Sequence, residues 1–235
     1  ANGYVFYHNG LISVKKLLNV RGNVGFHTGN ILFVGDLAVH GDVLTNFGVH
    51  ARNVLVKGHI ESAKVKAVED LVCLSGIKGA NTSAVDDAPV KSAYMEGHVP
   101  STLIEAGGNI RLPFCEHVQI RAKGNVIIDG SCLHSTLYVG GKLIVKGRLQ
   151  GGVVYANSTV YVEGQLGSDY SSVTKVMMGY NPFAFLATQK LESQISYMKD
   201  KLAYFEKMAA RNHVMEQEYS PRVGLMTRKL RIAHA

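Results

Sequence analysis

Residues 126–142 read VIIDGSCLHSTLYVGGK, and the next seventeen, residues 143–159, read LIVKGRLQGGVVYANST. Each stretch begins with three apolar residues, which are followed by a polar residue, a glycine and a second polar residue. The block that starts at Val160, VYVEGQLG, opens in the same order, so the unit repeats every seventeen residues. A fixed period of this kind is typical of solenoids built from stacked, similar units.

The repeated units share apolar residues at two positions and glycine at a third. Two apolar positions separated by one residue lie on the same face of a strand. Glycine two residues later permits a sharp bend or a positive φ. Each unit therefore predicts two or three short strands joined at corners. The first position holds Leu37, Val54, Leu71, Ile110, Val126, Leu143 and Val160, the third holds Val39, Val56, Cys73, Leu112, Ile128, Val145 and Val162, and the fifth holds Gly41, Gly58, Gly130, Gly147 and Gly164.

These columns predict an all-β solenoid, specifically a right-handed parallel β-helix, with an α-helical coiled-coil appendage at the C-terminal end. Coils stacked at the spacing of hydrogen-bonded strands would form a rod of roughly 35 Å. The right-handed sense is favoured because left-handed β-helices use hexapeptides, and seventeen is not a multiple of six. A β-sandwich with regularly spaced strands is the alternative. A tight corner of each coil would hold Ala51, Ala67, Ala106, Ala122 and Ala156.

Residues 78–103 interrupt the repeat with a weak apolar pattern and two prolines, Pro89 and Pro100. We expect a loop that leaves the rod at this point. Functional loops often project from rigid scaffolds, although an insertion that the fold simply tolerates is the favoured interpretation.

The residues after the repeat follow a different period. This change predicts two segments, a solenoid over residues 1–182 and a helical segment over residues 183–235. Apolar residues recur there at alternating steps of four and three, the pattern of a coiled-coil seam. Pro182 marks the expected helix start, and Pro221 is expected to break the helix and begin a returning one. We expect the seam to meet another copy, with packing on the rod as the alternative. The oligomerisation seam consists of Leu191, Ile195, Met198, Leu202, Phe205 and Ala209.

Composition excludes several classes of protein. The net charge of +7 is not concentrated with aromatic residues in a basic patch, so we expect no nucleic-acid partner. No apolar run reaches the ~20 residues that span a membrane. The three cysteines, Cys73, Cys115 and Cys132, form no C-x-x-C pair and favour free thiols in a reducing compartment.

No set of residues predicts catalysis, a cofactor or a metal. His40, His50 and His59 lack the spacing of a metal site. Cys115 and His117 are expected to point the same way on one strand, but they have no third member of a catalytic triad. A ladder of alternating charges is expected at Asp129, Lys146 and Glu163. We therefore expect a protein that is not an enzyme.

Taken in order, the motifs resemble those of the flagellar assembly protein A (FapA) family of bacteria. The stretches that carry this resemblance are GNILFVGDLAVHGDV, VLVKGHIESAKVKA, GIKGA, GRLQGGVVYA, GQLGS and VMMGYNP, followed by the helical segment. The resemblance covers about residues 1–210.

This resemblance implies a right-handed β-helix followed by a coiled coil, in a cytoplasmic protein whose relatives are linked to the cell pole. It implies a non-enzymatic scaffold in flagellar assembly or placement and a link to the glucose-specific EIIA component of the sugar phosphotransferase system. It also implies a further domain ahead of the β-helix, and the missing initial Met favours a piece of a longer protein. The alternatives are a bactofilin-like polymer and, less favoured, a β-helix enzyme that acts on polysaccharides.

Overall fold

The structure is a computed structural model that describes residues 3–80, 102–167 and 173–233, with side chains described through Met208. By its internal contacts the chain divides into two compact units, Ala1–Leu186 and Ala187–Ala235. The first unit contains every strand, and the second contains most of a single long helix.

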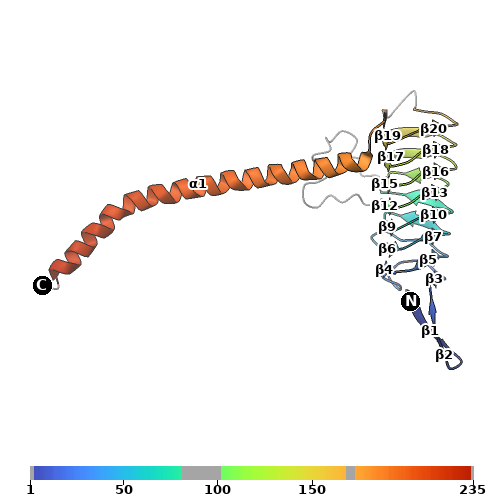
Figure 1. Cartoon of the computed structure of the whole chain (residues 1–235), viewed down its shortest axis with the longest axis horizontal. Helices are drawn as coiled ribbons and strands as arrows, with labels where there is room; N and C mark the ends of the chain where they lie inside the picture. Colours follow the sequence, from blue (N-terminus) through green and yellow to red (C-terminus); the bar gives the residue numbers. More distant parts are fainter. Residues whose placement is uncertain (1–2, 81–101, 168–172, 234–235) are drawn as a thin grey trace. The chain divides into compact units, whose positions relative to one another are not determined.

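A parallel sheet of eight strands forms one wall of the first unit (Figure 1). Neighbouring strands in this sheet come from successive coils of the chain, so each strand stacks on the equivalent strand of the coil before it. From the C-terminal to the N-terminal end the strands are β20 (Val160–Val162), β18 (Leu143–Val145), β16 (Val126–Ile128), β13 (Ile110–Leu112), β10 (Leu71–Cys73), β7 (Val54–Val56), β5 (Asp36–Val39) and β3 (Leu17–Val20).

The register of this sheet reproduces the columns seen in the sequence. Val54 pairs with Leu37 and with Leu71, and Val126 pairs with Leu143. The seventeen-residue period therefore equals one coil, and the predicted parallel β-solenoid is confirmed. The sandwich alternative is wrong, because the strand pairs of the rod are parallel between coils.

A second parallel sheet of eleven strands forms the other two walls. Its long strands β17 (Cys132–Val139) and β19 (Leu149–Ala156) run through both walls, whereas earlier coils divide the same path into two short strands. One wall contains β8 (His59–Glu61), β11 (Gly76–Lys78) and β14 (Cys115–Glu116); the other contains β4 (Ile31–Leu32), β6 (Gly48–Ala51), β9 (Lys64–Ala67), β12 (Leu103–Ala106), β15 (Gln119–Ala122) and β21 (Thr174–Met178).

We call the eight-stranded wall the first face, the wall with β8, β11 and β14 the second face, and the wall with β6, β9 and β15 the third face. The inward side chains of all three form one continuous apolar core. Its largest enclosed members include Leu37, Ile60, Leu112, Ile120 and Leu143. The predicted alanine corner is also confirmed, since Ala51, Ala67, Ala106 and Ala122 stack in register.

The glycine column is needed for a reason other than the predicted one. None of the five repeated glycines is among the described residues with positive φ. A Cβ at Gly147 would instead lie 2.7 Å from the backbone of Gly130, and one at Gly164 would lie 2.4 Å from the carbonyl oxygen of Gly147. Glycine is therefore required because successive coils bring their backbones together at this corner.

Left-handed backbone occurs at a different corner, between the second and third faces. Asn46, Ser62, His117 and His134 have φ between 41° and 69°, and Gly151 has φ of 67°. Stacked coils thus turn at equivalent places, mostly with residues other than glycine. Backbone bonds continue across this corner, since the Asn46 N–H donates to the Ser62 carbonyl at 3.1 Å.

The interruption in the repeat enters and leaves the rod at this same corner. Lys78 pairs with Glu116 of the next coil, and Leu103 pairs with Gln119 of that coil. The extra sequence therefore lies between two strands of a single coil and leaves the register of the coils on both sides intact. Most of the predicted loop, residues 81–101, lies outside the described residues.

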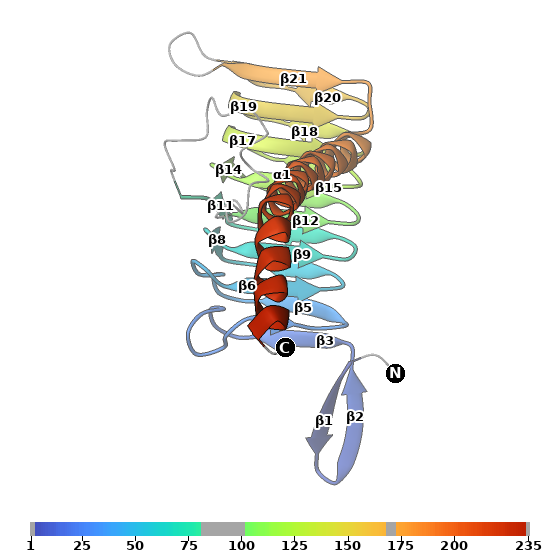
Figure 2. The same cartoon turned by 90° about the vertical axis from the view of Figure 1, so that its left-hand side faces the viewer.

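An antiparallel hairpin precedes the first coil. It consists of β1 (Tyr4–His8) and β2 (Leu11–Lys15), joined by Asn9 and Gly10, which both have positive φ. Figure 2 shows that the hairpin extends beyond β3 along the direction in which coils stack. Its contact with the first coil includes Tyr4, whose ring centroid lies 6.3 Å from that of Phe33.

The C-terminal end of the rod is extended by β21, which pairs with β19. Helix α1 (Pro182–Ala233) follows, and the Asn181 side chain accepts a hydrogen bond from the Phe183 N–H at 3.0 Å. The predicted start at Pro182 is confirmed. The predicted break at Pro221, with a returning helix, is wrong because one helix continues past it. The part of α1 before Pro221, residues 182–220, contains no glycine that could form a left-handed helix end.

Candidate functional site

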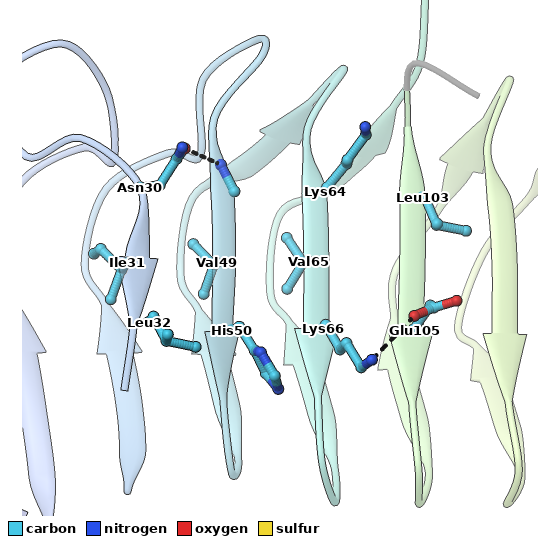
Figure 3. A pocket seen from close by; sticks show the side chains of 11 residues that line it. Asn30, Ile31, Leu32, Val49, His50, Lys64, Val65, Lys66, Leu103 and Glu105 are labelled. Atoms are coloured by element: carbon cyan, nitrogen blue, oxygen red, sulfur yellow. Dashed lines mark hydrogen bonds and ion pairs between the residues drawn. The ribbon is translucent and has the colours of Figure 1, made fainter. Parts of the chain in front are cut away.

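A shallow trough crosses the third face over its first four strands, with a volume of about 400 Å³. Gly48 opens the trough, since a Cβ there would meet no atom closer than 3.7 Å. Apolar side chains from several coils line it together with amide, imidazole, ammonium and carboxylate groups (Figure 3). Its lining consists of Asn30, Ile31, Leu32, Gly48, Val49, His50, Lys64, Val65, Lys66, Leu103 and Glu105.

Two charged side chains of the trough, Lys66 and Glu105, belong to one outward column of the third face. Lys66 Nζ lies 3.8 Å from a carboxylate oxygen of Glu105, and Arg121 Nη1 donates to Glu105 at 3.1 Å. Glu105 is thus held between two cations on neighbouring coils. Lys64 and His50 add further donors on the N-terminal side, so the trough suits a partner surface that mixes apolar and acidic groups.

The same column continues as aromatic residues toward the C-terminal end. Arg121 lies 5.9 Å from the centroid of the Tyr138 ring, and Tyr138 stacks on Tyr155 with centroids 4.9 Å apart. Phe185, in the first turn of α1, lies 5.6 Å from Tyr155. Both tyrosines and Leu186 are buried, and burial raises the pKa of Tyr155. Phe183 and Phe185 thus pack against the outward tyrosines of the third face.

Helix α1 presents the predicted seam as an exposed row. The exposed fractions of Leu191, Ile195, Met198, Leu202 and Phe205 lie between 49% and 61%. The side chain of Ala209 lies outside the described part of the chain. Five large apolar side chains at heptad spacing would be costly to leave in water. The row can bind an apolar partner, but the coiled coil itself stays a prediction.

A polar ladder, which the sequence analysis missed, runs along the corner where each coil enters the first face. The side-chain oxygen of each member accepts a hydrogen bond from the next coil, from a backbone N–H in four members and from the side-chain amide of Asn53 at Asp36. Examples are Asn125 N to Asn109 Oδ1 at 2.9 Å and Lys142 N to Asn125 Oδ1 at 2.8 Å. The signal was available, because each member directly precedes a first-column residue. This corner ladder consists of Asp36, Asn53, Asp70, Asn109 and Asn125.

The histidines singled out in the sequence are not brought together. His40 flanks the first face, His59 lies on the second and His50 on the third. His40 Nε2 contacts Asn19 Oδ1 at 3.4 Å, and His59 donates its backbone N–H to Asp42 at 2.7 Å. Within the described residues, no group of three or more His, Cys, Asp or Glu side chains could hold a metal ion.

The predicted positions of the cysteines are only partly right. Cys73 is buried in the third column as expected, and burial raises the pKa of its thiol. Cys115 and His117 do not share one side of a strand, because β14 ends at Glu116 and His117 adopts left-handed backbone. Cys115 is enclosed beside Cys132, which raises the pKa of Cys115 well above its ordinary value. The His117 ring stacks instead on His134, 5.2 Å away.

Two carboxylates on the rod are held by cations of neighbouring coils. Asp129 lies 2.7 Å from Lys146 Nζ and 2.9 Å from Arg111 Nε, which confirms the Asp129–Lys146 part of the predicted charge ladder. Asp36 accepts two hydrogen bonds from Arg52. Hydrogen bonding to these cations lowers the pKa of both carboxyls. These pairs stabilise the stacking of coils and form no catalytic set.

Comparison with protein families gives one match that covers most of the chain. A family model described as the Flagellar Assembly Protein A beta solenoid domain matches residues 16–229. No curated protein and no solved structure matches the chain. Among the described helical residues, none forms a stretch apolar enough to cross a membrane.

Proposed function

The chain belongs to the FapA beta-solenoid family, and from this premise we propose that it is a non-enzymatic scaffold in bacterial flagellar assembly or placement. The observation that carries the proposal is the family match over residues 16–229. The rod supplies a rigid frame, and the helix supplies an exposed apolar row. Together these features suit a protein that acts by binding other proteins in the cytoplasm.

Self-association through α1 is the first part of this proposal. The seam side chains are uncovered although they follow the spacing with which two helices pack. A second copy offers the same seam and would cover it. Because both copies carry the same seam residues, the two apolar rows have the same length.

The second part concerns the protein partner, which we propose is the glucose-specific EIIA component of the sugar phosphotransferase system. The trough on the third face is where we place this contact, because it offers apolar side chains beside Lys64 and His50. Placement at the cell pole would follow from such contacts.

Light scattering tests the first part. Changing Leu191, Ile195 and Leu202 together to Asp should reduce the mass of the full chain in solution. Tyr197→Asp with Tyr204→Asp is the matched control, because these side chains are equally exposed, at 55% and 58%, on another side of the helix. An unchanged mass in the seam variant would refute the seam.

Purified EIIA component tests the second part by biolayer interferometry. Lys64→Glu with His50→Glu should weaken binding at least tenfold, whereas Lys57→Glu on the flank of the first face should not. Equal binding by all three proteins would exclude the trough as the contact surface.

End-to-end polymerisation, as in bactofilins, is less well supported. It would require free terminal coils, and the hairpin β1–β2 lies beyond β3 at the N-terminal end (Figure 2).

A further inference from the structure

The seam of helix α1 is bordered by charged residues that distinguish between the two directions in which a second helix could pack on it. Heptad positions are written a to g, with the seam at a and d. Ile195 and Leu202 occupy a, and Leu191, Met198 and Phe205 occupy d. Charges at the bordering e and g positions decide how two helices are oriented. The e position holds Glu192, Lys199 and Glu206, and the g position holds Gln194, Lys201 and Met208.

All six bordering side chains are exposed, so a second helix can meet their charges. On its own helix, the positions three and four residues from Glu206, where an ion pair could form, hold one leucine and three alanines. Lys201 Nζ lies 4.7 Å from the centroid of the Tyr197 ring. A cation–π contact between exposed groups is weak, so it does not prevent Lys201 from binding a carboxylate.

We propose that α1 pairs in parallel with α1 of a second copy, and that Lys201 of each copy binds Glu206 of the other. This inference rests on the self-association proposed above and adds its orientation and its specific contact. Each rod leads into the N-terminal end of α1, so both rods join the pair at the same end. One dimer therefore presents two copies of every rod surface to a partner.

A parallel pair covers the whole described seam and brings opposite charges together. Identical residues share each layer from Leu191 to Phe205, and each g residue meets the e residue five positions further along the other helix. Lys201 thus meets Glu206 twice, once on each side of the seam. The preceding g residue is the uncharged Gln194, so within residues 187–208 no like charges meet.

An antiparallel pair that covers Phe205 brings like charges together instead. It sets Phe205 opposite Ile195 and Met198 opposite Leu202, and its bordering residues meet e to e and g to g. Like charges repel at these short distances, so the contacts disfavour this register. They are Lys199 with Lys199, Lys201 with Lys201 and Glu192 with Glu206.

Sliding the antiparallel pair by one heptad removes the repulsion but uncovers the largest seam side chain. Glu192 then meets Lys199, whereas Phe205 faces Thr188 instead of an apolar residue. Phe205 is 61% exposed in the single chain, and in each copy its ring would lack an apolar cover. Of the three arrangements, only the parallel one combines a covered seam with attraction between its borders.

Analytical ultracentrifugation of the full chain tests the ion pair. Lys201→Glu and Glu206→Lys should each weaken self-association about threefold or more, because both contacts become like-charged. The chain that carries both changes should associate as well as the unmodified chain. Lys207→Glu and Asp200→Lys are the matched controls, since they make the same changes of charge at exposed positions away from the seam. Unweakened association of Lys201→Glu overturns the proposal, because both antiparallel arrangements predict it.

Cysteine cross-linking reports the orientation directly. Leu202→Cys should form a covalent dimer with itself on treatment with diamide, which takes up the two thiol hydrogen atoms as the disulfide forms. The native cysteines are buried and should not react. A Leu202→Cys chain that cross-links only when mixed with Met198→Cys or Leu191→Cys would show antiparallel pairing and overturn the proposal.

The mass of the unmodified chain separates this proposal from the one on which it rests. A chain that stays at 25.5 kDa at about 100 µM would overturn self-association itself. A dimer that gives the antiparallel cross-link would overturn the orientation alone. A dimer in which Leu202→Cys cross-links to itself supports both.

Discussion

Asn109 lies directly beside Asp70 in the corner ladder although thirty-nine residues separate them in the chain, and its backbone N–H donates to Asp70 Oδ1 at 2.6 Å. The same Asp70 oxygen accepts from the Asn109 side chain at 3.1 Å. The ladder thus bridges the coil that contains the extra sequence. Without it, a backbone donor at the edge of each coil would lose its partner.

The first prediction concerns this ladder. Asp70→Ala should lower the free energy of unfolding by about 1 kcal/mol, because the Asn109 N–H loses its acceptor. Asp70→Asn keeps a side-chain oxygen in place and should be near neutral. Urea denaturation measures both. Equal destabilisation by the two variants would show that charge, rather than the acceptor, is what the ladder needs.

The second prediction compares two leucines that differ only in where their side chains lie. Leu112 is enclosed in the core, and Leu74 is 56% exposed. Leu112→Ala should cost about 2–5 kcal/mol of unfolding free energy, since it leaves a cavity between stacked coils. Leu74→Ala should cost about 0.5 kcal/mol or less in the same denaturation experiment. Similar costs would be inconsistent with the inward direction of Leu112.

The third prediction is an acid dependence of stability. The pKa values of Asp36 and Asp129 are lowered in the folded chain by bonds to Arg52, Arg111 and Lys146. A lowered folded pKa means that unfolded carboxyls bind protons more readily. The stabilisation is therefore full above the unfolded pKa of about 4 and is lost as pH falls below it.

Denaturation at several pH values between 7 and 3 checks this dependence. The pairs are partly exposed, so each should contribute less than about 1 kcal/mol. Asp129→Asn should lower stability more at pH 7 than at pH 3, because the stabilisation is lost as pH falls through the lowered folded pKa. A constant difference across the whole range would assign its effect to packing instead.

The fourth prediction concerns the attachment of the first helical turn. Tyr155→Ala removes the ring that lies between Tyr138 and Phe185, so backbone amides near Phe185 and Leu186 should exchange with deuterium faster. Tyr155→Phe keeps the ring and should exchange like the unmodified chain. Mass spectrometry of the corresponding peptide distinguishes these outcomes, and slow exchange in Tyr155→Ala would argue that other contacts hold the turn.

The core of the rod was predictable from the sequence because apolar residues recur at one regular spacing. Leu37, Val54 and Leu71 show this pattern without knowledge of the fold. The reason for Gly147 was not predictable, because its close neighbour Gly130 belongs to another coil. The path of the chain around His117 also escaped prediction, since left-handed backbone there depends on stacking rather than on glycine.

A candidate surface could be predicted from the sequence only where its residues lie close together in the chain. The helix seam is local in sequence, so Leu191 and Ile195 could be identified by spacing alone. The trough depends on the missing side chain of Gly48 and on charges from coils that are far apart in the sequence.

The corner between Lys78 and Leu103 shows that one coil can accommodate a long extra segment without shifting its neighbours. Evolution can therefore lengthen, shorten or replace sequence there while the rest of the rod is inherited unchanged. For the experimenter, the same corner is a suitable attachment point for a fluorescent reporter, because both ends of an added domain would join the rod within a few residues of each other.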